Sequence, residues 1–190
     1  MEGGLKAWEG ILPRGFPEPL IAYFTPAGAP GEYIALAWLL EDGTAGFYGE
    51  IAKKFDETGL SGLFDRLAEL EERHKEKLFE LYGSISGSKA GADFPHGILS
   101  DDSKGWFIEG GITLEEALGW MEGKQVKDIL ELCIALETIA YDRYIVMARK
   151  VEDALSKEVF ELLSQEEKEH LGEMTERIEK IPAGLLRAPE

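Results

Sequence analysis

The chain has 190 residues, and its 20 lysines and arginines against 37 aspartates and glutamates leave a formal net charge of −17. So acidic a chain argues against nucleic acid and anionic membranes as partners, because both bind through clustered Lys and Arg, and it favours cations. One cysteine, Cys133, excludes an internal disulfide and a cysteine-rich metal site, so any metal is expected on oxygen and nitrogen ligands. Neither a secretory signal nor a membrane-spanning apolar stretch is recognisable, which predicts a cytoplasmic protein.

The first half of the chain predicts an arm, two helices and a crossover. Repeated prolines among apolar side chains over residues 1–31 predict an irregular arm lying on the core, and residues 32–190 are expected to form one bundle domain. Helical periodicity predicts helices over 32–55 and 62–82. The Gly-, Ser- and Asp-rich segment 83–111 has no sustained period and is interpreted as a long crossover.

The second half predicts one short and two long helices. Thr113 to Glu116 fits a capping box that would start a short helix. Long helices are predicted over 124–152 and 157–180, the last capped by Ser156. The expected fold is therefore all-α, a four-helix bundle with a long crossover between its second and third long helices.

Two Glu-x-x-His pairs stand out, Glu71 with His74 and Glu167 with His170. Residues three apart on a helix lie on one face about one turn apart, so both side chains can bind one ion. In helices as rich in glutamate as these, an isolated pair is more often surface charge. The spacing of two further glutamates decides between these interpretations.

Glu41 precedes Glu71 by 30 residues, and Glu137 precedes Glu167 by the same interval. An offset of 96 residues relates the two sets, which predicts a duplicated helical hairpin. Each glutamate pair is centred on a hairpin turn, so four carboxylates and two imidazoles are expected at one level inside the bundle. Buried carboxylates that crowd together must be protonated or bind cations, and two divalent ions would cancel their charge.

With these motifs the sequence resembles the rubrerythrin-like branch of the ferritin-like superfamily over about residues 32–180. The resemblance implies a ferritin-like four-helix bundle that holds two iron ions, with manganese as the other metal that suits such ligands. The ligands that it implies are Glu41, Glu71, His74, Glu137, Glu167 and His170.

The resemblance also assigns roles to these side chains. It implies that Glu71 and Glu167 bridge the two ions, that the other two glutamates are terminal ligands, and that each histidine binds one ion. Tyr48 and Tyr144, each seven residues after a terminal glutamate, would support catalysis from behind the ligands by hydrogen-bonding the carboxylates.

Two departures from rubrerythrins bear on the expected activity. The chain has no rubredoxin domain with its Cys-x-x-Cys pairs, so electrons are expected from an external donor such as a rubredoxin-type protein. Rubrerythrins also carry an extra glutamate three residues before the third-helix ligand, where this chain has Ile134.

The resemblance implies an oxidoreductase of oxidative stress that reduces hydrogen peroxide or O2. A ferroxidase or iron-handling protein remains the alternative, and a non-catalytic, metal-stabilised binding bundle is the alternative of another class.

Several other residues are open to a functional interpretation. Cys133 lies one turn before Glu137 and is interpreted as a small buried hydrophobe. Glu166 and Glu169 flank predicted ligands and are interpreted as exposed charge. Apolar residues of the arm, together with Trp106 and Phe107, leave a homodimer interface and core lining both open.

Overall fold

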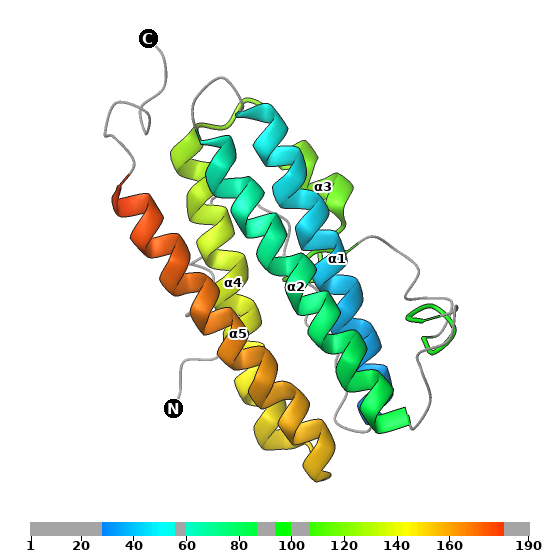
Figure 1. Ribbon diagram of the computed structural model, residues 1–190. Coiled ribbons are helices and arrows are strands. Elements are labelled where there is room, and N and C mark those ends of the chain that lie inside the picture. The colour runs from blue at the N-terminus through cyan, green and yellow to red at the C-terminus, as the bar shows by residue number, and fades with distance from the viewer. Residues whose placement is uncertain (1–27, 56–59, 87–93, 100–106, 181–190) are drawn as a thin grey trace.

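The computed structural model describes residues 28–55, 60–86, 94–99 and 107–180. Within these ranges it contains the helices α1 (Pro30–Lys54), α2 (Ser61–Ser86), α3 (Leu114–Trp120), α4 (Val126–Lys150) and α5 (Ala154–Glu179). Figure 1 shows α1 running beside α2 and α4 beside α5, with the short α3 against α1. The predicted all-α, ferritin-like four-helix bundle is confirmed.

Capping residues explain where α1 and α3 begin. α1 starts at Pro30, two residues before the predicted start, because proline suits the first helical turn and the Glu32 carboxylate accepts the Ala29 N–H at 2.8 Å. At α3 the predicted capping box is confirmed. The Thr113 hydroxyl accepts the Glu116 N–H at 3.2 Å, and the Glu116 carboxylate accepts the Thr113 N–H at 3.0 Å.

The predicted cap of the last helix is wrong. α5 begins at Ala154, and the Asp153 carboxylate accepts the Ser156 N–H at 2.7 Å. Asp153 is therefore the capping residue, and Ser156 supplies one of the N–H groups that it caps. An ionised carboxylate is a stronger acceptor for the free N–H groups of a helix start than a hydroxyl is, and its charge also suits that end of the helix dipole.

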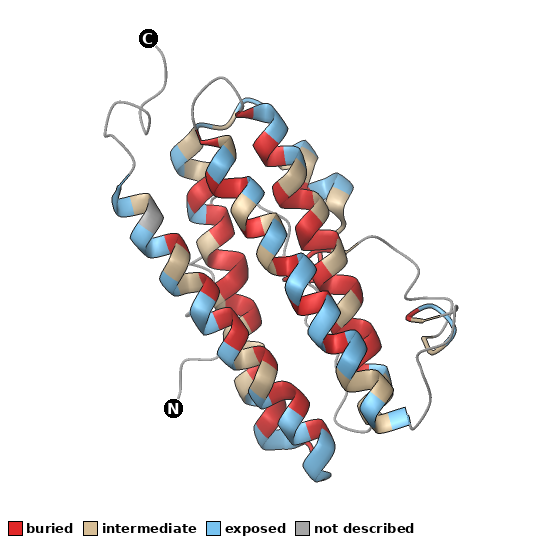
Figure 2. Cartoon of the chain, viewed as in Figure 1, coloured by how far each residue is buried: buried red, intermediate tan, exposed pale blue. Residues whose placement is uncertain are grey.

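Two apolar clusters fill the bundle on either side of a polar level. One contains Phe47 and Phe64 with the buried Cys133, and the other contains Ile34 and Phe160. Figure 2 shows that the buried parts of the long helices lie mainly on the faces that turn toward the bundle interior. The polar side chains between the clusters are therefore shielded from water at both ends.

Parts of the predicted arm and crossover lie outside the described residues, including residues 1–27 and Trp106. Phe107 is described and packs against the second apolar cluster, which favours core lining for that residue. The described helices include none with the length and apolar character needed to cross a membrane.

Candidate metal centre

The four long helices bring the six predicted ligands together in the polar level of the bundle. α1 contributes one glutamate, α4 one glutamate, and α2 and α5 each a Glu-x-x-His pair. All six side chains are buried, and their ligand atoms form overlapping groups within 4.8 Å of one another. The residues so placed are Glu41, Glu71, His74, Glu137, Glu167 and His170.

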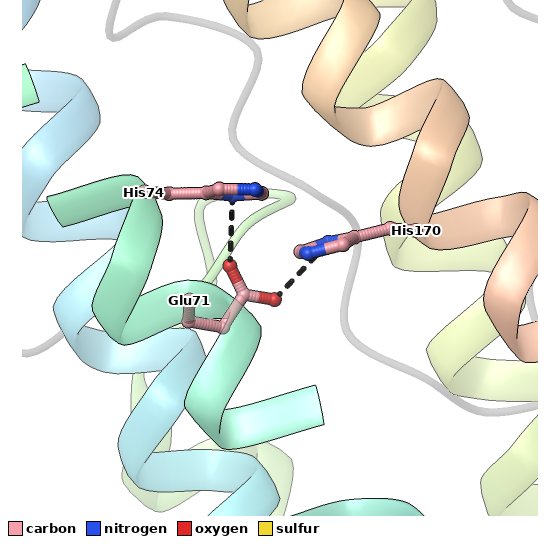
Figure 3. A group of neighbouring side chains, drawn as sticks. All are labelled: Glu71, His74 and His170. Atoms are coloured by element: carbon pink, nitrogen blue, oxygen red, sulfur yellow. Dashed lines mark ion pairs between the residues drawn. The ribbon is translucent and has the colours of Figure 1, made fainter. Parts of the chain in front are cut away.

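Glu71 lies between the two imidazoles. Its Oε2 is 3.6 Å from Nδ1 of His74, and its Oε1 is 3.4 Å from Nδ1 of His170 (Figure 3). Each imidazole has a further carboxylate at the same nitrogen, Glu41 at 3.3 Å from His74 and Glu137 at 3.1 Å from His170. Both Nδ1 atoms therefore face one shared group of carboxylates.

Glu167 is the repeat counterpart of Glu71 and also lies between the two halves. It forms one three-residue group with Glu41 and His74, and another with Glu137 and His170. The two imidazole rings face each other with centroids 4.4 Å apart and an interplanar angle of 20°. The geometry is that of two adjacent ligand sets with two shared carboxylates.

Several buried oxygens in this centre lack a hydrogen-bond donor. Among the described residues, neither carboxylate oxygen of Glu71 or Glu167 has a hydrogen-bond partner, and neither does Oε1 of Glu41. Burial raises the pKa of the Glu71 carboxyl well above its usual value, and the charge of Glu41 adds to this effect. Since oxygens without donors are costly to bury, this set of groups fits cations that would replace the missing donors.

Glu41 and Glu137, the glutamates of α1 and α4, have lowered pKa values instead of raised ones. Burial raises the pKa of Glu137, but the charge of His170 and its hydrogen bond outweigh that effect and lower the value to about 2. Burial also raises the pKa of Glu41, but contacts with the Glu71 carboxyl and the His74 imidazole outweigh that effect and lower the value. An ionised carboxylate thus faces each imidazole, which is the form that binds metal.

The two predicted tyrosines are buried behind the carboxylates but have different partners. The Tyr48 hydroxyl donates to Oε1 of Glu137, whereas the Tyr144 hydroxyl donates to Oε1 of Glu109 at 3.2 Å. Burial, and then the nearby Glu137 charge, raises the pKa of Tyr48 well above its usual value, so its hydroxyl remains a donor.

Sequence reasoning missed Glu109, which reaches the centre from the end of the crossover. The residue is 1% exposed. The available signal was a lone acidic residue in the run Phe107-Ile-Glu-Gly-Gly111, between apolar residues and a glycine pair. Without a helical period in this segment, spacing did not connect it to the other carboxylates.

The interpretation of Glu166 as exposed charge is wrong. Its carboxylate is buried at 2.7 Å from Nε2 of His74, and the Lys77 ammonium binds the same carboxylate at 2.7 Å. α2 covers this side of α5, so a position next to Glu167 is closed off from water. Glu169 is exposed, as predicted, and accepts a hydrogen bond from Gln165.

One comparison with known proteins matches the second half of the chain. The rubrerythrin family model matches residues 128–186, which include nearly all of α4 and the whole of α5. No curated protein and no solved structure matches the chain. Fold and centre define the class as a ferritin-like helical bundle with carboxylate and histidine groups suited to metal.

Within that class, the match confirms the rubrerythrin-like resemblance that the sequence indicated. It supports metal binding, usually of iron, at these carboxylate and histidine groups.

Proposed function

We propose that this protein is a rubrerythrin-like oxidoreductase that reduces hydrogen peroxide or O2 at a pair of iron ions, with electrons from an external donor. The observation that carries the proposal is the buried group of four glutamates and two histidines, with both Nδ1 atoms turned toward shared carboxylates. Manganese suits the same ligands and is the alternative metal.

The contacts support a specific division of the ligands. Glu71 faces both imidazoles, and Glu167 belongs to groups with both histidines, so these two glutamates are proposed to bridge. Each remaining glutamate lies against a single imidazole, which suits a terminal ligand. Each ion would then be held by one imidazole, one terminal carboxylate and the two shared ones.

The surrounding residues would keep protons and ligands in place. When bound, a pair of ferrous ions would supply two electrons together, which with two protons would reduce hydrogen peroxide to two water molecules without release of a one-electron radical. The Tyr48 hydroxyl holds its proton against Glu137, which fixes the orientation of that carboxylate. The apolar clusters above and below exclude bulk water from the centre.

Anaerobic titration with Fe(II), followed by stopped-flow mixing with each oxidant, tests the proposal. We expect two ions per chain and an absorbance change on mixing with hydrogen peroxide or O2, with repeated turnover when a reduced rubredoxin-type donor is added. Iron that accumulates far beyond two ions per chain would instead identify an iron-handling protein. Two bound ions that react with neither oxidant within minutes would identify a metal-stabilised, non-catalytic bundle.

A further inference from the structure

The crossover returns to the bundle through a tight turn at residues 107–113. The Ile108 N–H donates to the Ile112 carbonyl at 2.9 Å, and the Gly111 N–H donates back to the Ile108 carbonyl at 2.9 Å. Gly110 and Gly111 have φ values of 90° and 78°, a backbone region that glycine adopts without strain. The turn therefore holds the intervening residue, Glu109, in a defined position.

The turn docks against α1. A Cβ atom at Gly43 would lie 2.0 Å from the Phe107 carbonyl oxygen, so only glycine allows the turn to approach this closely. Next to it, the Thr44 hydroxyl accepts the Glu109 N–H at 3.0 Å and donates to the Leu40 carbonyl at 3.0 Å. The helix thus anchors the backbone of the very residue whose side chain enters the centre.

Only the first half of the repeat has the glycine and the hydroxyl against which the turn docks. At the offset of 96 residues, Gly43 corresponds to Ile139 and Thr44 to Ala140, neither of which supplies the space or the hydroxyl. The two repeat-related tyrosines differ accordingly: Tyr48 donates directly to a predicted ligand, Glu137, whereas Tyr144 donates to Glu109. The crossover turn is therefore a feature added to the symmetric centre.

The Glu109 side chain joins the carboxylates of the centre. Its Oε1 accepts the Tyr144 hydroxyl, and among the described residues its Oε2 has no hydrogen-bond partner. Burial raises the pKa of Glu109 well above its usual value, as do the charges of Glu41 and Glu137, while a contact with the Glu167 carboxyl lowers it. Reciprocally, burial and then the Glu109 charge raise the pKa of Glu167.

We propose that Glu109 is a seventh metal-ligating carboxylate, delivered to the centre by the crossover turn. The inference rests on the proposed function, since it presumes that metal occupies the centre. A buried oxygen without a donor, on a carboxyl that contacts Glu167 and feels the charges of Glu41 and Glu137, is stabilised by a cation. Tyr144 orients the carboxylate through its other oxygen, as expected for a group behind a ligand.

Anaerobic titration with Co(II) alone tests the inference, because the visible spectrum of Co(II) depends on its number of ligands. In Glu109→Gln, which keeps the side-chain size and an acceptor for Tyr144, we expect weaker binding of at least one ion by about tenfold or more and an altered spectrum. Glu169→Gln, which removes an exposed carboxylate of α5, is the matched control and should behave as the wild type.

Two results would overturn the proposals separately. If the wild type binds two Co(II) ions and Glu109→Gln has the same affinities and spectrum, Glu109 is only an anchor for Tyr144. If the wild type itself does not bind two ions, the proposed function fails first. Should Glu109→Gln not fold, Glu109→Asp withdraws the carboxylate by one methylene. The same spectral change is expected in that variant, and an unchanged spectrum would equally contradict ligation.

Discussion

Glu71 is the side chain on which the two ligand sets meet, because its two oxygens face different imidazoles. Glu71→Ala should therefore lose both metal ions, whereas His74→Ala should mainly weaken one. Elemental analysis after anaerobic reconstitution measures the number of ions per chain. Loss of a single ion in both variants would show that Glu71 does not bridge.

Glu166 determines which nitrogen of the His74 imidazole is free to bind a metal. Burial opposes its ionisation, but hydrogen bonds from His74 and Lys77 lower the pKa of Glu166 to about 2, so it is ionised at neutral pH. A carboxylate at Nε2 holds the proton on that nitrogen and leaves the Nδ1 lone pair for a metal. Among the described residues, Nε2 of His170 has no hydrogen-bond partner, so this support is confined to one half of the centre.

Glu166→Gln should accordingly weaken the ion bound by His74 by about 10- to 100-fold and leave the His170 ion nearly unchanged. Competition titration with a chelator measures the two affinities. The control is Glu169→Gln on the same helix, which should alter neither. Equal weakening of both ions would mean that Glu166 acts on the bundle as a whole and not through one imidazole.

At the scale of the elements, α1 and the crossover turn fit together through Gly43. Gly43→Ala should destabilise the metal-free protein by roughly 1–3 kcal/mol, because the added methyl group collides with the Phe107 carbonyl and displaces the turn. Denaturant unfolding measures the change in free energy.

A second glycine of the same helix provides the matched control. A Cβ atom at Gly49 meets nothing within 4 Å, so Gly49→Ala should stabilise the protein by about 0.5–1 kcal/mol through its higher helix propensity. Destabilisation by both substitutions would show that the methyl at position 43 is felt through the helix itself and not through the turn.

For the whole molecule, crowding of the carboxylates should make the metal-free protein less stable both as the pH rises and as it falls from about 4.5. The raised pKa values of Glu71, Glu109 and Glu167 mean that the folded state holds more protons than the unfolded state, so stability falls as the pH rises above about 4.5. The lowered values of Glu137 and Glu166, each about 2, mean that stability also falls as the pH drops from 4.5 toward 2.

Metal-free protein should therefore melt at a lower temperature at pH 7 than at pH 5. Bound metal should reverse this trend, because it favours the ionised carboxylates. Thermal melts of both forms at the two pH values decide the matter. Parallel pH dependences with and without metal would show that these carboxylates are not the groups that respond.

The sequence by itself determined the helical hairpins and six of the residues that meet in the bundle. Both follow from regular spacing, since a helix converts intervals of three and thirty residues into a shared face and a shared level. The predicted start of the last helix is three residues too late. Asp153 and Ser156 are equally good capping residues by sequence, and only the folded chain shows that Asp153 accepts the N–H.

Only the tertiary structure decided the surroundings of that centre. Glu166 and Glu169 look alike in sequence, but α2 covers one and leaves the other exposed. Glu109 lies in a segment without period, and its position depends on a glycine and a hydroxyl of α1 that are distant in the chain. A periodic pattern encodes which residues share a helix face, whereas burial by a neighbouring element and the docking of a turn arise from contacts that no local spacing specifies.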